Sequence, residues 1–197
     1  MSTSDHGRLG VGFLGAGPVT QAIHLPALAR LTDTFRVTTV MDVSADTAAS
    51  VAGRVGARST TSLDDMLSDP DVDVVAICSP HKFHAEQVIA ACRAGKRAVL
   101  CEKPFAMSGA EAEEITAVSE ETGVPIVVGA MHVYDPGWRA VREQWGEVPS
   151  VVHTVRSSIV LPPNPRFEDF ATEVIFRPEA PKPDYDDPSV AAARVHG

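Results

Sequence analysis

The short stretch from Val11 to Thr20 constrains the fold of this chain more than any other part of the sequence. An apolar run ends at Leu14, and two glycines, Gly15 and Gly17, follow before a segment of helical character begins. A strand that passes through a glycine turn into a helix is typical of the opening of a doubly wound, dinucleotide-binding sheet. Gly15 would allow the tight turn, and Gly17 would let the backbone come close to a pyrophosphate at the helix N-terminus.

The third position of this fingerprint holds Thr20 instead of glycine or alanine. A small side chain still packs a helix against a strand there, though less closely. We assign Pro18 and Val19, which lie between the second glycine and Thr20, to the same predicted cofactor site. The turn alone leaves an ordinary α/β protein as an open alternative, because similar glycine turns occur in many of them.

The periodicity of the chain predicts an α/β fold from residue 8 to about 130. The predicted strands are residues 9–14, 37–41, 72–78, 98–101 and 125–130, and the predicted helices are residues 21–31, 45–55, 62–67, 84–94 and 108–122. Pro26 must end or kink the first turns of the first helix. The run VDVVAIC is nearly all apolar, as a central parallel strand covered on both faces should be. We therefore predict a doubly wound parallel sheet.

The charge and the cysteines exclude several kinds of partner. The net charge is −9, from 17 basic and 26 acidic residues, and this argues against nucleic acid or an anionic membrane surface. No apolar run approaches the length of a membrane span, and the polar N-terminus MSTSDHGR does not resemble a signal peptide. The spacings of Cys78, Cys92 and Cys101 suit no zinc site, so we predict no metal and a reduced, cytoplasmic protein.

The texture of the sequence changes after residue 147. We predict a first domain over residues 1–147, including a linking helix, and the incomplete start of a second α+β domain over residues 148–197. This second part holds a β-rich run and then a series of prolines between Pro162 and Pro188, which excludes regular helix or central strand. Fifty residues broken in this way are too few for a good independent core.

Asp42 ends the second long predicted strand, 22 residues after Thr20. This is about the offset of ~20 residues expected for a carboxylate that binds the ribose hydroxyls of a dinucleotide. A carboxylate there would repel a 2′-phosphate, and the next several residues include no Arg or Lys to accommodate one. NAD is therefore favoured over NADP. An N-cap role for Asp42, on the helix that begins at Ala45, is equally compatible with the sequence.

A second candidate site follows the strand at residues 98–101, where Glu102, Lys103 and Pro104 come in succession. Ligands of doubly wound sheets bind outside the carboxyl ends of the strands. Pro104 bars Lys103 from helical geometry. At the floor of a cleft we expect Lys103 to be poorly solvated, and able to exchange a proton with a hydroxyl or carbonyl while the cofactor moves the hydride. A surface lysine at a turn is the alternative.

The order of these signals resembles the Gfo/Idh/MocA family, which includes glucose–fructose oxidoreductase and inositol 2-dehydrogenase. The resemblance covers residues 8 to about 165, and rests on GAG, Asp42, the motif HLPAL at residues 24–28, and AICSPHKFHAEQVIAACRAGKRAVLCEKP. It implies a Rossmann domain that binds NAD or NADP. It also implies oxidation or reduction of a secondary alcohol or ketone on a sugar, cyclitol or related polyol. In the family, the lysine that corresponds to Lys103 touches both the nicotinamide and the reacting oxygen.

The same resemblance implies further site residues. Ser79, Pro80, His84 and Glu102 are expected to line the cofactor cleft, and the Lys103–Pro104 bond to be cis. From the residues alone, His84 fits the first turn of a helix. His132 follows the last predicted strand, and faces either the cleft as a catalytic group or a packed interdomain seam. Trp138 and Trp145 would share one helix face, and more simply pack that helix onto the next domain than bind sugar.

Relatives in this family carry a second domain that supplies most substrate contacts and often the dimer interface, and the resemblance implies that this chain stops early in it. Three interpretations follow. The first is an oxidoreductase subunit, in a homo-oligomer or a heteromer with a homologous subunit, whose substrate half comes from a second polypeptide. The second is a nucleotide-binding or regulatory protein that lost catalysis, and the third is a truncated gene product. We favour the first, because both the cofactor and the lysine motifs are intact. A methyltransferase is a more remote alternative, since it gives the Glu102–Pro104 segment no role.

Overall fold

The structure is a computed structural model that describes residues 7–145, 153, 154 and 156. The chain divides into two compact units with a boundary between Gly129 and Ala130. The described part of the first unit is residues 7–129, and that of the second is residues 130–145 with the three isolated positions. The predicted boundary after residue 147 lies outside the described residues, as does most of the predicted second domain.

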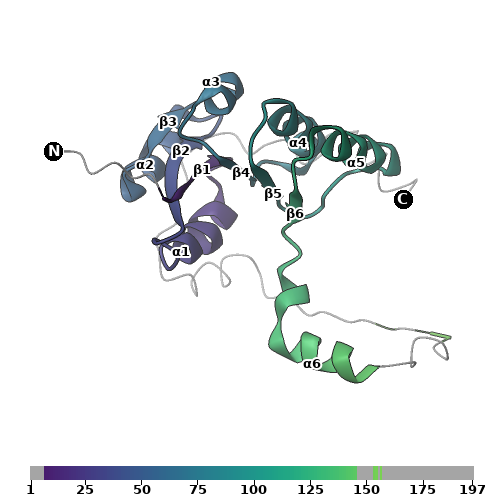
Figure 1. Ribbon diagram of the computed structural model, residues 1–197. Helices are drawn as coiled ribbons and strands as arrows, with labels where there is room; N and C mark the ends of the chain where they lie inside the picture. The colour runs from purple at the N-terminus through teal and green to yellow at the C-terminus, as the bar shows by residue number, and fades with distance from the viewer. Residues whose placement is uncertain (1–6, 146–152, 155, 157–197) are drawn as a thin grey trace. The chain divides into compact units, whose positions relative to one another are not determined.

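Residues 7–129 form a six-stranded, parallel sheet in the order β3-β2-β1-β4-β5-β6 (Figure 1). The strands are β1 (Leu9–Leu14), β2 (Phe35–Met41), β3 (Arg58–Thr60), β4 (Val74–Ile77), β5 (Ala98–Cys101) and β6 (Ile126–Val128). The direction of winding reverses between β1 and β4, which makes their carboxyl ends the topological switch point of the fold. The predicted α/β doubly wound class is confirmed. Strand β3 was not predicted, because its three residues are all polar.

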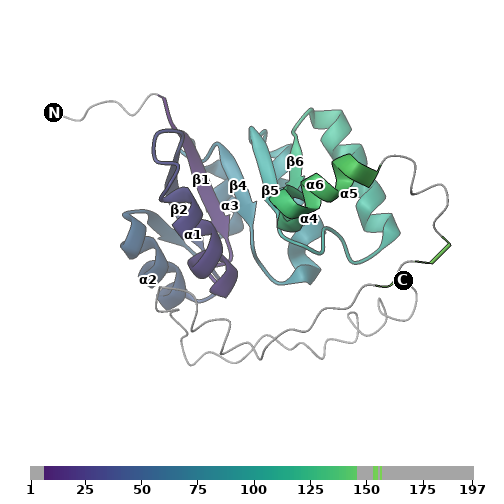
Figure 2. The same ribbon diagram turned by 90° about the horizontal axis from the view of Figure 1, so that it is seen from below.

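Helices cover both faces of this sheet. On one face, α3 (Leu63–Ser68), α4 (His84–Arg93) and α5 (Gly109–Thr122) pack on side chains such as Leu14, Val75 and Ile77. On the other face, α1 (Leu25–Leu28) and α2 (Ala45–Val55) pack on Val11, Phe13 and their neighbours. Figures 1 and 2 show the two helical layers from two sides. The alternation of side chains along each strand accounts for the two separate cores.

Three helices begin at a capping serine, and two of them end at a glycine. The side chains of Ser44, Ser62 and Ser108 cap α2, α3 and α5, each accepting a hydrogen bond from a backbone N–H in the first turn. Gly56 and Gly123 end α2 and α5 in the left-handed conformation, which glycine adopts without steric cost. The sequence predicted these stops to within a residue or two.

The first helix is shorter and less regular than the predicted helix at residues 21–31. It opens as a π-helix, η1 (Thr20–His24), and continues as α1. The N–H of Leu25 bonds to the carbonyl of Thr20, five residues back. Pro26 explains the wider turn, because its ring would clash with the carbonyl four residues back in a straight α-helix.

The second unit begins with a short 3₁₀ turn, η3 (Met131–Tyr134), and the helix α6 (Pro136–Trp145). The carboxylate of Asp135 accepts hydrogen bonds from the N–H groups of Gly137 and Trp138, so it caps α6. The rings of Trp138 and Trp145 lie edge to face with centroids 5.9 Å apart. They therefore share one helix face, as predicted, and no described residue of α6 is buried.

The cysteines are free, and Cys92 and Cys101 are buried. Burial raises the pKa of both Cys78 and Cys101 to about 12, so these thiols stay protonated. Among the described residues, no three His, Cys, Asp or Glu side chains gather as a metal site would require. The helices in this part of the chain are also too short or too polar to traverse a bilayer.

Candidate cofactor and catalytic site

The glycine turn after β1 has one glycine that the fold requires and one that leaves space. Gly15 has φ +94°, and a Cβ there would lie 2.7 Å from the carbonyl oxygen of Cys78. Gly15 therefore permits the close approach of the β1 and β4 ends. A Cβ at Gly17 would meet no described heavy atom within 4 Å. This open position at the start of a helix fits a phosphate group, because phosphates bind where backbone N–H groups are exposed and crowding is low.

The residues after Gly17 lead directly into the helix. Pro18 and Val19 are exposed and helical, and proline is well suited to the first helical position, where no N–H is needed. Thr20 is buried, and its hydroxyl donates a 2.6 Å hydrogen bond to the carbonyl of Gly15. Thr20 therefore braces the turn, a role that its place in the fingerprint did not predict.

Asp42 lies beside the same turn. One carboxylate oxygen accepts from the N–H of Ala16 at 2.9 Å, and the other accepts from the N–H of Ser44 at 3.0 Å. The residue that caps α2 is Ser44, so the interpretation of Asp42 as the N-cap was wrong. Asp42 links the two strand-end turns instead. A carboxylate has about four acceptor sites, so this one retains capacity for ribose hydroxyls.

His84 contacts the segments that follow β4 and β5. Its imidazole ring is fully buried at the start of α4. Its Nδ1 lies 2.7 Å from the carbonyl oxygen of Pro104, and its Nε2 lies 2.9 Å from that of Ser79. The hydroxyl of Ser79 donates a hydrogen bond to the side-chain oxygen of Gln87, which lies on α4 like His84. The structure therefore brings Ser79, His84 and Pro104 together. Their contact with a cofactor, and that of Pro80, stays a prediction.

Glu102 occupies the buried end of β5. Its carboxylate lies 2.9 Å from Nε2 of His24 and accepts a 3.2 Å hydrogen bond from the N–H of Lys103. A Cβ at Gly129 would lie 2.9 Å from the carboxyl carbon of Glu102, so this glycine leaves room for it. His24 was absent from the predicted site residues. The signal for it was the HLPAL motif, in which it is the first residue.

Lys103 follows Glu102 and is exposed. The prediction that Lys103 is poorly solvated is wrong for the described residues. Glu102 takes the buried position at the end of β5, and Lys103 follows it in an exposed position. The Lys103–Pro104 bond is cis, as predicted. Desolvation, the charge of nearby His84 and the charge of Lys103 lower the pKa of His81.

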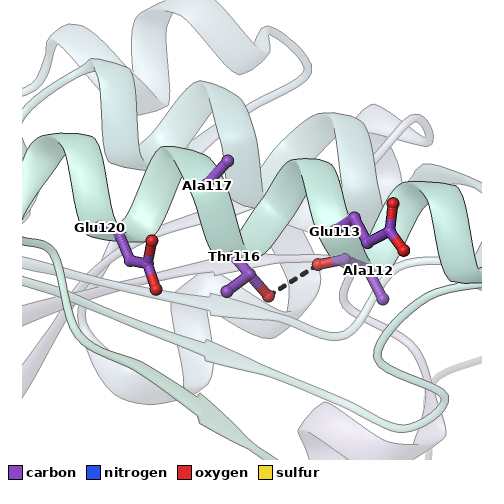
Figure 3. Close-up of a pocket in the computed structure, with 5 residues that line it drawn as sticks. All are labelled: Ala112, Glu113, Thr116, Ala117 and Glu120. Atoms are coloured by element: carbon purple, nitrogen blue, oxygen red, sulfur yellow. Dashed lines mark hydrogen bonds between the residues drawn. The ribbon is translucent and has the colours of Figure 1, made fainter.

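His132 belongs to the second unit and is exposed, and its predicted catalytic contact stays a prediction. Figure 3 shows a hollow on the outer face of α5, lined by Ala112, Glu113, Thr116, Ala117 and Glu120. It contains none of the predicted site residues.

The match to a family model agrees with this geometry. The model, described as "Oxidoreductase family, NAD-binding Rossmann fold", is that of Gfo/Idh/MocA and matches residues 9–130. The chain belongs to this family. Inositol 2-dehydrogenase 3 of Saccharopolyspora erythraea is 42% identical over 134 residues, which cover 68% of this chain and 39% of that protein.

Two solved structures are similar to this chain. GenD2 from gentamicin A biosynthesis, in complex with NAD, is 30% identical with a TM-score of 0.67 over 76% of this chain and 42% of that one. KijD10, a 3-ketoreductase from Actinomadura kijaniata with NADP and TDP-benzene, is 31% identical with a TM-score of 0.66 over 71% and 42%. This chain thus spans about two fifths of the length of the relatives that it matches.

Proposed function

We propose that this Gfo/Idh/MocA chain interconverts a secondary alcohol and a ketone on a sugar, cyclitol or related polyol, with NAD as hydride carrier. The observation that carries the proposal is the link between the two halves of the site. His24 belongs to the helix after the glycine turn, and it contacts Glu102, the residue before Lys103, at 2.9 Å. Lys103 therefore lies beside the helix that would bind the cofactor phosphates.

Each residue of the site has a distinct part in this chemistry. Gly17 and the helix that follows would hold the pyrophosphate, and Asp42 would hold the ribose hydroxyls and repel a 2′-phosphate. The nicotinamide, when bound, carries the hydride to or from the substrate carbon. Lys103 accepts the hydroxyl proton during oxidation and returns it to the carbonyl oxygen during reduction. His132 is proposed as a second polar group at the substrate.

We also propose that the site is completed by a second polypeptide, either a homologous subunit or another copy of this chain. The exposed apolar side chains of Trp138 and Val141 on α6 support this. The preference for a polyol follows from the inositol 2-dehydrogenase relative. The free cysteines suit a reducing compartment such as the cytoplasm.

The test of the catalytic role is Lys103→Ala, assayed for NAD binding by fluorescence titration and for turnover with a panel of polyols that includes myo-inositol. The assay uses the chain alone and together with its candidate partner subunit. We expect NAD affinity to be retained and turnover to fall by ~10²–10⁴-fold, because one proton-transfer group is lost. Unchanged turnover would remove Lys103 from the mechanism. NAD binding without turnover in every preparation of the unsubstituted chain would favour a nucleotide-binding protein.

Asp42→Ala tests the cofactor preference in the same titrations. We expect the dissociation constant for NADP, divided by that for NAD, to fall by roughly tenfold, because one charged hydrogen-bonding group is lost. A ratio that does not change would leave Asp42 with only its structural contacts to Ala16 and Ser44.

A further inference from the structure

The segment that carries Lys103 is held on both sides by histidine rings, that of His24, which is partly buried, and that of His84, which is fully buried. Glu102 precedes Lys103 and Pro104 follows it, and each contacts a histidine from another element. Lys103 itself is exposed. A flexible, exposed side chain can act at a defined point only if its backbone is fixed.

The first contact is between His24 and Glu102. The side chains are 17% and 9% exposed, with Nε2 and Oε1 2.9 Å apart. The other oxygen of this carboxylate accepts the N–H of Lys103. His24 ends the π-helical turn that Pro26 explains. The chain of contacts thus runs from the helix after the glycine turn, through one buried carboxylate, to the backbone of Lys103.

The second contact is between His84 and Pro104. The ring of His84 is fully buried, and its two nitrogens face two carbonyl oxygens on different loops, those of Pro104 and Ser79. With one nitrogen within hydrogen-bond distance of each oxygen, the ring links the segment after β5 to the segment after β4. Because the ring of His84 has no exposed surface, it cannot contact a ligand directly. It can affect a ligand only by positioning the segments of Pro104 and Ser79.

We propose that His24 and His84 are positioning residues that together hold Lys103 at the carboxyl end of β5, the strand next to β4. The proposal rests on the proposed function of Lys103 for its effect on turnover. Its structural part, that both rings restrain residues 102–107, stands independently of any reaction. Loss of either ring releases one side of the segment, and loss of both releases the two sides.

The experiment measures amide hydrogen exchange in peptides that cover residues 102–107, in the full 197-residue chain. The variants are His24→Leu and His84→Leu, which remove the polar contacts, and His24→Gln and His84→Gln, which keep an N–H donor. Glu113→Gln is the control, because Glu113 is exposed on the outer face of α5 (Figure 3). Peptides over β1 report whether each variant keeps its fold.

We expect each leucine variant to speed exchange in residues 102–107 by roughly tenfold, the scale of a lost hydrogen bond, with β1 unchanged. The glutamine variants should recover most of the protection, and the control should match the unsubstituted chain. Unchanged exchange in both leucine variants with a folded β1 would overturn the proposal. If a leucine variant fails to fold, the glutamine variant at the same position becomes the test. Exchange in its residues 102–107 that is as fast as in an unfolded peptide would also overturn the proposal.

Turnover then separates this proposal from the function on which it rests. In a preparation that oxidises a polyol, we expect His24→Leu and His84→Leu to lower kcat by at least tenfold, with little change in NAD affinity. His24→Gln and His84→Gln should restore most of kcat. Faster exchange with unchanged kcat would make the two rings merely structural. Unchanged turnover in Lys103→Ala would reject the function, while the exchange result would still stand.

Discussion

Helices α5 and α6 both carry apolar residues at helical spacing, but only α5 buries them. In α5, Ile115 and Val118 are 0% and 4% exposed, because the helix packs on α4 and on the core over the sheet. In α6, Trp138 and Val141 are 43% and 51% exposed. An apolar stripe on a helix stabilises a fold only when something covers it. The comparison places the stability of the described chain in residues 7–129.

The difference also separates two kinds of function. The first unit holds the glycine turn, Asp42 and Lys103, each braced by hydrogen bonds to neighbouring elements or residues. The second unit offers a stripe of Trp138, Val141 and Trp145 at intervals of three and four residues, in which Trp138 and Val141 are exposed. Aromatic residues in such a stripe are enriched where proteins meet partners. We therefore expect the first unit to respond to substitution in stability, and the second in association.

The largest expected effect is on stability, from a matched pair of truncations. Ile115→Ala should lower the free energy of unfolding by about 2–5 kcal/mol, because it leaves a cavity between α5 and the sheet. Val141→Ala should change it by less than about 0.5 kcal/mol, as exposed substitutions do. Urea unfolding followed by circular dichroism measures both. A cost above about 1 kcal/mol for Val141→Ala would mean that α6 is packed in solution.

The same comparison explains what the sequence could predict. The sheet and its glycine turn depend on local patterns, such as the apolar run before Gly15, and local patterns are readable. The N-cap of α2 is an exception, because Asp42 and Ser44 both precede the helix and the structure selects Ser44. The pairing of His24 with Glu102 depends on a fold that brings residues 78 positions apart to 2.9 Å. Lys103 is likewise exposed because Glu102, and not Lys103, takes the buried position at the end of β5. Contacts and burial of this kind depend on the assembled sheet and cannot be read from local patterns.

A smaller effect on stability is expected from removing the carboxylate charge of Asp69 in the first unit. Asp69 accepts hydrogen bonds from the hydroxyl of Thr39, the guanidinium of Arg58 and the N–H of Asp71. Burial alone would raise the pKa of Asp69, but these hydrogen bonds and the charge of Arg58 lower it below 3.8. Asp69→Asn should therefore cost about 1–2 kcal/mol at pH 7, the scale of a hydrogen bond to a charged group.

The pH dependence of that cost has a definite sign. Because the folded pKa lies below the unfolded value, the carboxylate stabilises the fold above about pH 4, and this contribution is lost as the pH falls through the folded pKa. The gap between the unsubstituted chain and Asp69→Asn should therefore close on acidification, in urea unfolding at a series of pH values. Glu113→Gln, at an exposed carboxylate, is the control. A gap that stayed constant down to pH 3 would contradict the assignment.

The smallest change in stability, and the most informative change in behaviour, is expected from Trp138→Ala. Its ring packs edge to face on that of Trp145 within the stripe, so the free energy of unfolding should shift by less than about 0.5 kcal/mol. If the stripe binds the subunit that completes the site, the dissociation constant should rise at least tenfold, since buried tryptophans often dominate interfaces. Light scattering after size exclusion, over a range of concentrations, measures this. Arg139→Ala, one residue away and exposed, should leave association nearly unchanged. If both variants associate as the unsubstituted chain does, the partner binds elsewhere, and the contrast between α5 and α6 concerns stability alone.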